Sequence, residues 1–94
     1  MDIKHKDDGK KGAFYIEVDG KQKALITYTY AGPKKIIIDH TEVDASLKGQ
    51  GVGYQLVEAS VQYLRDNKLK VIPLCPFAAA VFKKKQEDYK DVLS

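Results

Sequence analysis

Glycines alternate with other residues at positions 49, 51 and 53, within the segment Lys48-Gly49-Gln50-Gly51-Val52-Gly53. The residues after this segment repeat apolar side chains at helical spacing, so the glycines precede a helix. Free backbone N–H groups and the positive end of the helix dipole meet at such a turn, where glycine lets a phosphate approach the backbone. The pattern therefore favours a phosphate-binding loop over the simpler alternative, a plain strand-to-helix turn.

Two common nucleotide-binding loops do not fit this segment. A P-loop needs Gly-Lys-Ser/Thr after four intervening residues, and the sequence contains no such run. A Rossmann loop follows the first strand of a parallel sheet, with an acidic residue about 20 positions later. Here alternating strands precede the turn, and Lys70, Val71 and Ile72 occupy the later region. We therefore expect a different phosphate compound.

Three further residues could take part in chemistry. Cys75 ends a short apolar run, where a thiol is a nucleophile, an acid or simply a small buried side chain. His40 has the same strand parity as Glu42, Ile38 and Ile36, so the two polar side chains should project from one face if no bulge intervenes. His40 with Glu42 could deprotonate an ammonium group. The simpler alternative is a histidine that hydrogen-bonds within the sheet.

The remaining pattern predicts the elements that position these residues. Alternating apolar residues predict strands over 13–19, 23–30 and 35–43, which form an antiparallel meander. Helical spacing predicts a helix over 51–67, followed by a buried strand over 69–75 and a second helix over 77–86. The strand-helix-strand order requires a crossover, which makes strands 35–43 and 69–75 parallel. The expected fold class is α+β with a mixed sheet: a meander, a β-α-β crossover and a short C-terminal helix.

Length and composition limit the architecture and the partners. The 94 residues suit one domain, expected over residues 13–94, and the charged residues 1–12 predict a mobile arm. The net charge is +3, and Arg65 is the only arginine among sixteen basic residues. Nucleic-acid readers rely on arginine, so a nucleic-acid-binding module is the weakest of the functions considered. The run Lys83-Lys84-Lys85 reads as a solvated helix face or as a contact to a phosphate.

Several classes of protein are disfavoured. One cysteine excludes an internal disulfide, and two histidines with one cysteine argue against a metal site. No apolar run reaches the length of a signal sequence or a membrane span. We therefore expect a cytoplasmic protein with no metal and no membrane contact, in the form of a monomer or weak dimer.

The glycine segment resembles the pyrophosphate loop of the GNAT acetyltransferases, usually Gln/Arg-x-x-Gly-x-Gly/Ala, with Lys48 in the first position. The order of elements over residues 13–90 is also similar to that of the family. The short chain, His40-Thr41 before the loop and Cys75-Pro76 after it resemble the minimal single-domain, YjdJ-type branch. The resemblance implies that acetyl-coenzyme A binds through its pyrophosphate to residues 50–54 and through its pantetheine arm to residues 41–43. The implied binding residues are Thr41, Glu42, Val43, Lys48, Gly49, Gln50, Gly51, Val52, Gly53 and Tyr54.

The resemblance also implies a reaction and shows a departure from the family. Family members splay the two parallel strands, which suits Pro73 because proline lacks a ladder N–H. Many carry an Asn near the start of the last helix and, seven residues later, a Tyr that acts as the acid; the aligned positions hold Cys75 and Phe82. The implied function is N-acyl transfer from acetyl-coenzyme A to an amine, with Cys75, His40 and Glu42 as candidate catalytic residues. The alternative is a non-catalytic module that binds or senses acyl-coenzyme A.

Overall fold

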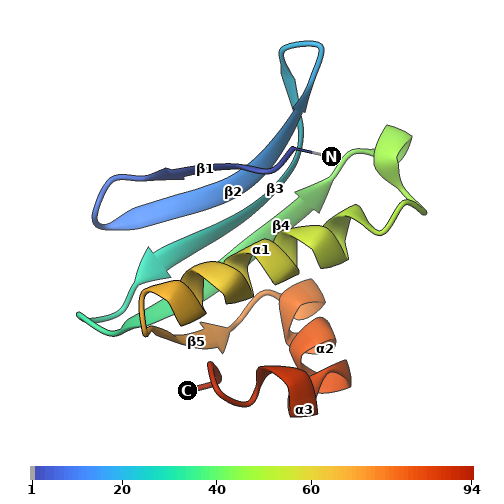
Figure 1. Ribbon diagram of the computed structural model, residues 1–94. Helices are drawn as coiled ribbons and strands as arrows, with labels where there is room; N and C mark the ends of the chain where they lie inside the picture. Colours follow the sequence, from blue (N-terminus) through green and yellow to red (C-terminus); the bar gives the residue numbers. More distant parts are fainter. Residues whose placement is uncertain (1) are drawn as a thin grey trace.

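The computed structural model describes residues 2–94 and contains one five-stranded mixed sheet (Figure 1). The strands follow chain order across the sheet; the first four are antiparallel to their neighbours, and the fifth pairs parallel to the fourth. This arrangement confirms the predicted fold class. The strands are β1 (Lys4–Asp7), β2 (Lys11–Val18), β3 (Lys21–Tyr30), β4 (Lys35–Val43) and β5 (Lys70–Pro73).

The helices gather beside one face of the sheet. Helix α1 crosses that face in Figure 1. Helix α2 packs against α1 through Phe77, whose ring lies against Gly53 of α1. A short 3-10 turn precedes α1, and Lys85 separates α2 from α3, where the sequence predicted a single helix over 77–86. The bounds are η1 (Ala45–Leu47), α1 (Val52–Asp66), α2 (Pro76–Lys84) and α3 (Gln86–Tyr89).

The core lies between the sheet and α1. Alternating residues of the meander point toward the helix, which explains why the period-two pattern located these strands. Helix α1 presents its apolar positions at spacings of three and four to the same layer. The chain end packs back on this core, with Tyr89 and Val92 buried and Leu93 bridging to Val71. The largest fully buried core side chains include Ile16, Ile26, Tyr28, Ile36, Ile38, Leu56, Val57, Val61 and Leu64.

The N-terminal segment differs from the mobile arm expected over residues 1–12. Residues 4–7 form β1, an edge strand paired with β2. The His5 ring stacks on Phe14 at 4.1 Å between centroids, and its Nε2 lies 2.5 Å from the Tyr28 hydroxyl. The sequence did not predict this strand, because hydrophobic alternation is absent from it. His5 and Asp7 attach β1 to the sheet through an aromatic ring and polar atoms rather than through aliphatic side chains.

A β-bulge at Asp39 changes which face β4 presents. Ile38 is opposite Tyr28 and His40 is opposite Thr27, so Asp39 has no partner in β3. Side chains beyond the bulge exchange faces, because opposed residues share a face. His40 and Glu42 therefore lie on the sheet face away from α1, which we call the open face, whereas Ile38 is buried under the helix. His40 and Glu42 do project from one face, as expected, but the bulge separates that face from the one that Ile36 and Ile38 share.

The parallel strands part where β5 ends. Their pairing stops at Ile38 and Pro73, and the N–H groups of both Leu74 and Cys75 donate to the Ile38 carbonyl. Residues 39–43 of β4 continue past this point, and no strand within residues 2–94 pairs with that edge. The chain then turns away into α2. This division leaves the last part of β4 without a partner strand on the side of β5, where the N–H of Thr41 is directed to the Cys75 sulfur.

Candidate functional site

The glycine turn adopts a backbone conformation that requires glycine at two positions. Gly49 has φ of 81° and Gly51 has φ of 71°, both in the left-handed region that other residues disfavour. A Cβ built on either residue meets no atom within 4 Å. The space in front of both glycines is therefore open, and a ligand can approach the backbone there.

The turn presents unpaired N–H groups at the start of α1. The first helical hydrogen bond runs from the N–H of Gln55 to the carbonyl of Gly51, as expected one turn into a helix. Throughout the described chain, no group accepts a hydrogen bond from the N–H of residues 50–54. No acidic side chain occupies the first turn. The helix dipole and these donors together favour an anion at this position.

Gly53 is small for a different reason. A Cβ at this position would lie 2.5 Å from the Phe77 ring, far inside van der Waals contact. Gly53 therefore allows α1 and α2 to approach each other. The sequence placed all three glycines in the loop for a ligand, and the third has a packing role that the spacing alone cannot reveal.

Basic residues surround the exposed end of the turn. The Lys84 ammonium lies 5.8 Å from the centre of the Tyr54 ring, and the Lys85 ammonium lies 6.0 Å from it. Lys85 also pairs with Glu58, at 3.4 Å. Lys48 is exposed at the start of the turn. The charges of Lys48 and Lys84 are thus available to phosphate groups bound at the start of α1.

Cys75 meets Thr41 across the division between β4 and β5. The Cys75 Sγ lies 3.2 Å from the Thr41 Oγ1, and Cys75 immediately precedes α2. Burial opposes ionisation of the thiol, but hydrogen bonds from the Thr41 hydroxyl and from the N–H groups of Ala78 and Phe77 outweigh it. The net effect lowers the pKa of Cys75 below that of an ordinary cysteine. The Cys75 thiol therefore ionises more readily than the thiol of a typical buried cysteine.

His40 and Glu42 form a second pair on the other face of β4. The His40 Nε2 lies 3.2 Å from the Glu42 Oε1, and both side chains are exposed. The structure thus joins Cys75 to Thr41 and His40 to Glu42, but places the two pairs on opposite faces of the strand. Sequence reasoning assigned Thr41 to coenzyme contact alone and missed its contact with the thiol, since the bulge that turns Thr41 inward leaves no clear sequence signal.

The other candidate side chains supply neither the usual proton donor of the family nor a metal site. Phe82 occupies the position where many relatives carry a tyrosine that acts as the general acid. It is buried against Tyr89, with ring centres 5.1 Å apart. The Tyr89 hydroxyl bonds to Glu58. No group of three His, Cys, Asp or Glu within residues 2–94 could hold a metal ion. In the same part of the chain, no helix is long and apolar enough to cross a membrane.

Comparison with known proteins identifies the family. The sequence profile of the GCN5-related N-acetyltransferases matches residues 13–92. A GCN5-like protein from Staphylococcus aureus, with a solution structure determined by NMR, shares 39% identity and a TM-score of 0.74; the match covers 97% of this chain and 87% of that one. The chain therefore belongs to the GCN5-related N-acetyltransferase family, as the resemblance of the loop predicted.

More distant relatives share less of the sequence. Protein NATD1 of Xenopus tropicalis is 28% identical over 74 residues, which cover 78% of this chain and 68% of that protein. Protein NATD1 of Danio rerio is 30% identical, with 72% and 63% covered. The chain thus spans about two thirds of these relatives. The crystal structure of Tetrahymena GCN5, at 18% identity and TM-score 0.67, covers 83% of this chain and 51% of its own and shows the shared fold.

Proposed function

We propose that this protein transfers an acetyl group from acetyl-coenzyme A to an amine. The observation that carries the proposal is the contact between Cys75 and Thr41 at the point where β4 and β5 part, close to the glycine turn at the start of α1. Family membership supports the use of an acyl-coenzyme A. The free thiol is compatible with a reducing cytoplasm, where we expect the reaction to take place.

The residues of the turn suit the pyrophosphate of the coenzyme. The N–H groups of residues 50–54 would donate to its oxygens, and Gly49 and Gly51 leave room for it. Lys48 adds a positive charge. The unpaired edge of β4 at Thr41, Glu42 and Val43 offers backbone groups to the amides of the pantetheine arm. The coenzyme supplies the thioester, whose carbonyl would lie near Thr41 and Cys75.

The two residue pairs supply complementary proton chemistry. His40, next to Glu42, accepts a proton from the ammonium form of the acceptor on the open face. The amine nitrogen then bonds to the acyl carbon and releases a second proton to solvent, the carbon–sulfur bond breaks, and the electron pair leaves with sulfur. In the direct route the Cys75 S–H protonates that sulfur, and the Cys75 thiolate then takes up a proton from solvent.

Cys75 also allows a two-step route. Its thiolate bonds to the acyl carbon first, and the departing sulfur takes a proton from solvent. The amine nitrogen then bonds to the acyl carbon and releases a proton to solvent, and the bond from that carbon to the Cys75 sulfur breaks, which restores the thiolate. The hydrogen bonds that lower the Cys75 pKa favour this route, because they increase the thiolate fraction.

A second candidate function has one specific observation in its favour. The buried phenyl ring of Phe82 cannot donate a proton, so the acid found in many relatives is missing. This absence suits a module that binds acyl-coenzyme A without turnover. The two functions share the glycine turn and differ in whether Cys75 and His40 act on the thioester.

The test measures acetyl-coenzyme A binding by calorimetry and its consumption with pooled amines. Gly51→Val should weaken binding at least tenfold, about 1.4 kcal/mol. Gly20→Val is the matched control, since Gly20 has φ of 77° and open space but lies in the turn between β2 and β3. Gly51→Ala serves if the valine variant does not fold. Equal binding by the folded Gly51 and Gly20 variants would contradict the loop assignment, and binding without turnover by any amine would favour the module.

A further inference from the structure

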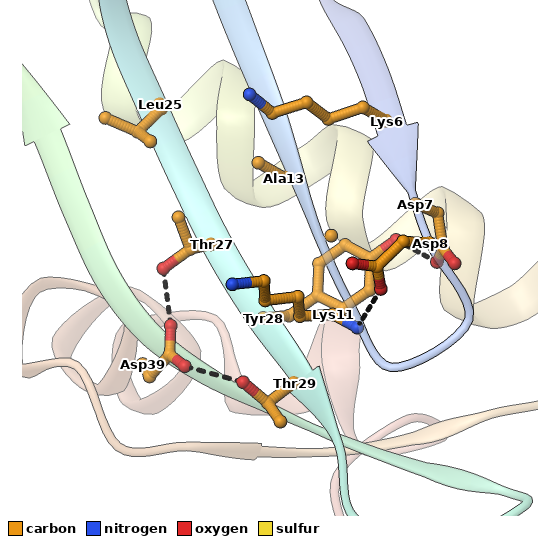
Figure 2. A pocket seen from close by; sticks show the side chains of 11 residues that line it. Lys6, Asp7, Asp8, Lys11, Ala13, Leu25, Thr27, Tyr28, Thr29 and Asp39 are labelled. Carbon is orange, nitrogen blue, oxygen red and sulfur yellow. Dashed lines mark hydrogen bonds between the residues drawn. The ribbon is translucent and has the colours of Figure 1, made fainter.

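The open face of the sheet carries a groove of about 520 Å³ that lies across β1 to β4 (Figure 2). Ala13 from β2 and Leu25 from β3 give it an apolar wall. Its charged lining residues are Asp39 on the β4 side and Lys6, Lys11, Asp7 and Asp8 on the β1 and β2 side. We call this feature the open-face groove. None of its residues belongs to the glycine turn or to the Cys75–Thr41 pair.

One side of the groove holds a prepared carboxylate. Asp39, the bulged residue of β4, accepts hydrogen bonds from the hydroxyls of Thr27 and Thr29, the latter at 2.9 Å, as the dashed lines in Figure 2 show. Each hydroxyl holds a different oxygen of the carboxylate. No Lys, Arg or His within residues 2–94 lies within salt-bridge distance of it. An exposed, oriented carboxylate without a cation suits an ammonium group.

Two lysines extend over the groove from its β1 and β2 side. Lys6 comes from β1 and Lys11 from β2, and the Lys11 side chain reaches over β3 toward Thr27 (Figure 2). Neither ammonium pairs with a carboxylate in the described chain. Two carboxylates also border this side, but both are bound elsewhere. Asp7 accepts from tyrosine hydroxyls, and Asp8 Oδ1 accepts from the N–H groups of Lys10 and Lys11. The Lys6 ammonium lies 5.1 Å from the centre of the Tyr15 ring, and the Lys11 ammonium is the cation of this side that can turn toward a ligand.

The acidic side of the groove adjoins the proposed reaction centre. Asp39 follows Ile38, whose carbonyl accepts hydrogen bonds from Leu74 and Cys75 where β5 leaves β4. His40 follows Asp39 and lies on the same open face. An ammonium held at Asp39 is thus beside the candidate base and beside the point where β5 leaves β4. The backbone of Lys11 lies two strands away, about 10 Å across the sheet, and its side chain extends over β3 (Figure 2).

We infer that the open-face groove binds the acceptor, and that the acceptor is an amine with an anionic group at its far end. The inference rests on the proposed function for the reaction, although binding in the groove can be measured without turnover. Asp39 holds the ammonium, the apolar wall contacts the middle of the molecule, and Lys11 holds the carboxylate or other anion. A second ammonium at the far end is disfavoured by the lysines.

The experiment compares 6-aminohexanoate, hexylamine and 1,6-diaminohexane, which share a six-carbon chain and differ at one end. Binding is followed by amide chemical shifts, with and without coenzyme A. We expect 6-aminohexanoate to bind about fivefold more tightly than hexylamine, the effect of one exposed ionic contact, and the diamine to bind most weakly. The shifts should map to β2, β3 and the bulge of β4. Equal affinities, or shifts that map elsewhere, would overturn the inference.

Substitutions in the groove test which residues bind the anionic end and the ammonium end of the ligand. Lys11→Gln should remove the preference for 6-aminohexanoate over hexylamine, whereas Lys21→Gln, a matched change outside the groove, should keep it. Asp39→Asn should weaken both amines. If Asp39→Asn disturbs the fold, Thr27→Val removes one hydroxyl that orients the carboxylate and should weaken both amines to a smaller degree. Retained preference in Lys11→Gln contradicts the assignment of the anionic end.

Coenzyme binding separates failure of this inference from failure of the proposed function. If the chain binds coenzyme A but the three amines bind alike, the acceptor assignment is wrong and the proposed function stands. If 6-aminohexanoate binds the groove but acetyl-coenzyme A does not bind the glycine turn, the groove stands as an amine site and the proposed function fails.

Discussion

The Asp7 carboxylate accepts a hydrogen bond of 2.6 Å from the Tyr28 hydroxyl, which joins the edge strand β1 to the centre of the sheet. The same oxygen accepts from Tyr30 at 2.6 Å and from Tyr63 of α1 at 3.3 Å. Partial burial opposes the charge, but the hydrogen bonds from Tyr28, Tyr30, Gly9 and Tyr63 outweigh it and lower the pKa of Asp7 to about 2. One carboxylate thus links β1, β3 and α1.

Acid should weaken this link in a defined range of pH. A carboxyl with a depressed pKa in the folded state stabilises the fold above its unfolded value, near 3.8, and loses that effect as the pH falls through about 2. Asp7→Asn should therefore lower the free energy of unfolding at pH 7 by about 1 kcal/mol, because the carboxylate is exposed and solvent screens its charge. The difference from the wild type should shrink between pH 4 and pH 2 in denaturant titrations. Asp2→Asn is the control, and a difference that does not depend on pH contradicts the assigned charge.

Removal of β1 should destabilise the protein. A chain that begins at Gly12 loses the stacking of His5 on Phe14 and the Asp7 hydrogen bonds, and exposes the edge of β2. We expect a lower midpoint of thermal unfolding. For a domain of this size, each 1 kcal/mol lost from the free energy of unfolding lowers the midpoint by about 4–8 °C. A chain that begins at Ile3 keeps β1 and serves as the control. Equal midpoints for the two chains would support the interpretation of residues 1–12 as a mobile arm.

Thr41 should control the reactivity of Cys75. Thr41→Val removes the hydroxyl that stabilises the thiolate, so the thiol pKa should rise and alkylation at pH 7 should slow. The rate of iodoacetamide modification as a function of pH reports this pKa. Thr29→Val, a change on the open face, should leave the profile unaltered. Bound coenzyme A should protect Cys75, and mass spectrometry after mixing with acetyl-coenzyme A tests for an acetyl group on the thiol.

Lys84 should contact the 3′-phosphate of the coenzyme. Its ammonium lies over Tyr54 at the start of α1, and no carboxylate pairs with it within residues 2–94. Lys84→Ala should weaken coenzyme A binding about fivefold, as expected for one exposed ionic contact. The variant should leave the affinity for dephospho-coenzyme A unchanged. Lys83→Ala is the neighbouring control. Equal loss for both ligands would place Lys84 away from that phosphate.

Local patterns predicted most of the fold. Alternation located β2, β3 and β4, and helical spacing located α1 to within one residue at each end. The glycine turn was readable because its spacing, its place before a helix and its family resemblance agree. Strand β1 was not readable, since it is held by tertiary contacts such as Asp7 with Tyr63, which lies 56 residues further along the chain.

The geometry of the candidate site depends on features with weaker sequence signals. No glycine or proline marks the bulge at Asp39, and the run Ile36-Ile37-Ile38 continues into it without a break. The bulge separates His40 from Cys75 and brings Thr41 to the thiol. The role of Gly53 could not be predicted from the sequence either. A glycine required for packing against Phe77 cannot be distinguished by sequence alone from a glycine required for phosphate binding.

The bulge at Asp39 also decides which changes of length β4 can absorb. Asp39 has no partner in β3, so its removal would leave a regular ladder in which His40 and Glu42 stay on the open face and Thr41 stays turned inward. An insertion of one residue after His40 would instead turn Glu42 toward α1 and Thr41 outward. Burial of the Glu42 charge in that layer costs several kcal/mol before any compensation. Substitutions along β4 change individual contacts, but an insertion beyond the bulge exchanges its inner and outer surfaces. Variants of this strand should therefore tolerate the loss of Asp39 far better than an added residue between His40 and Val43.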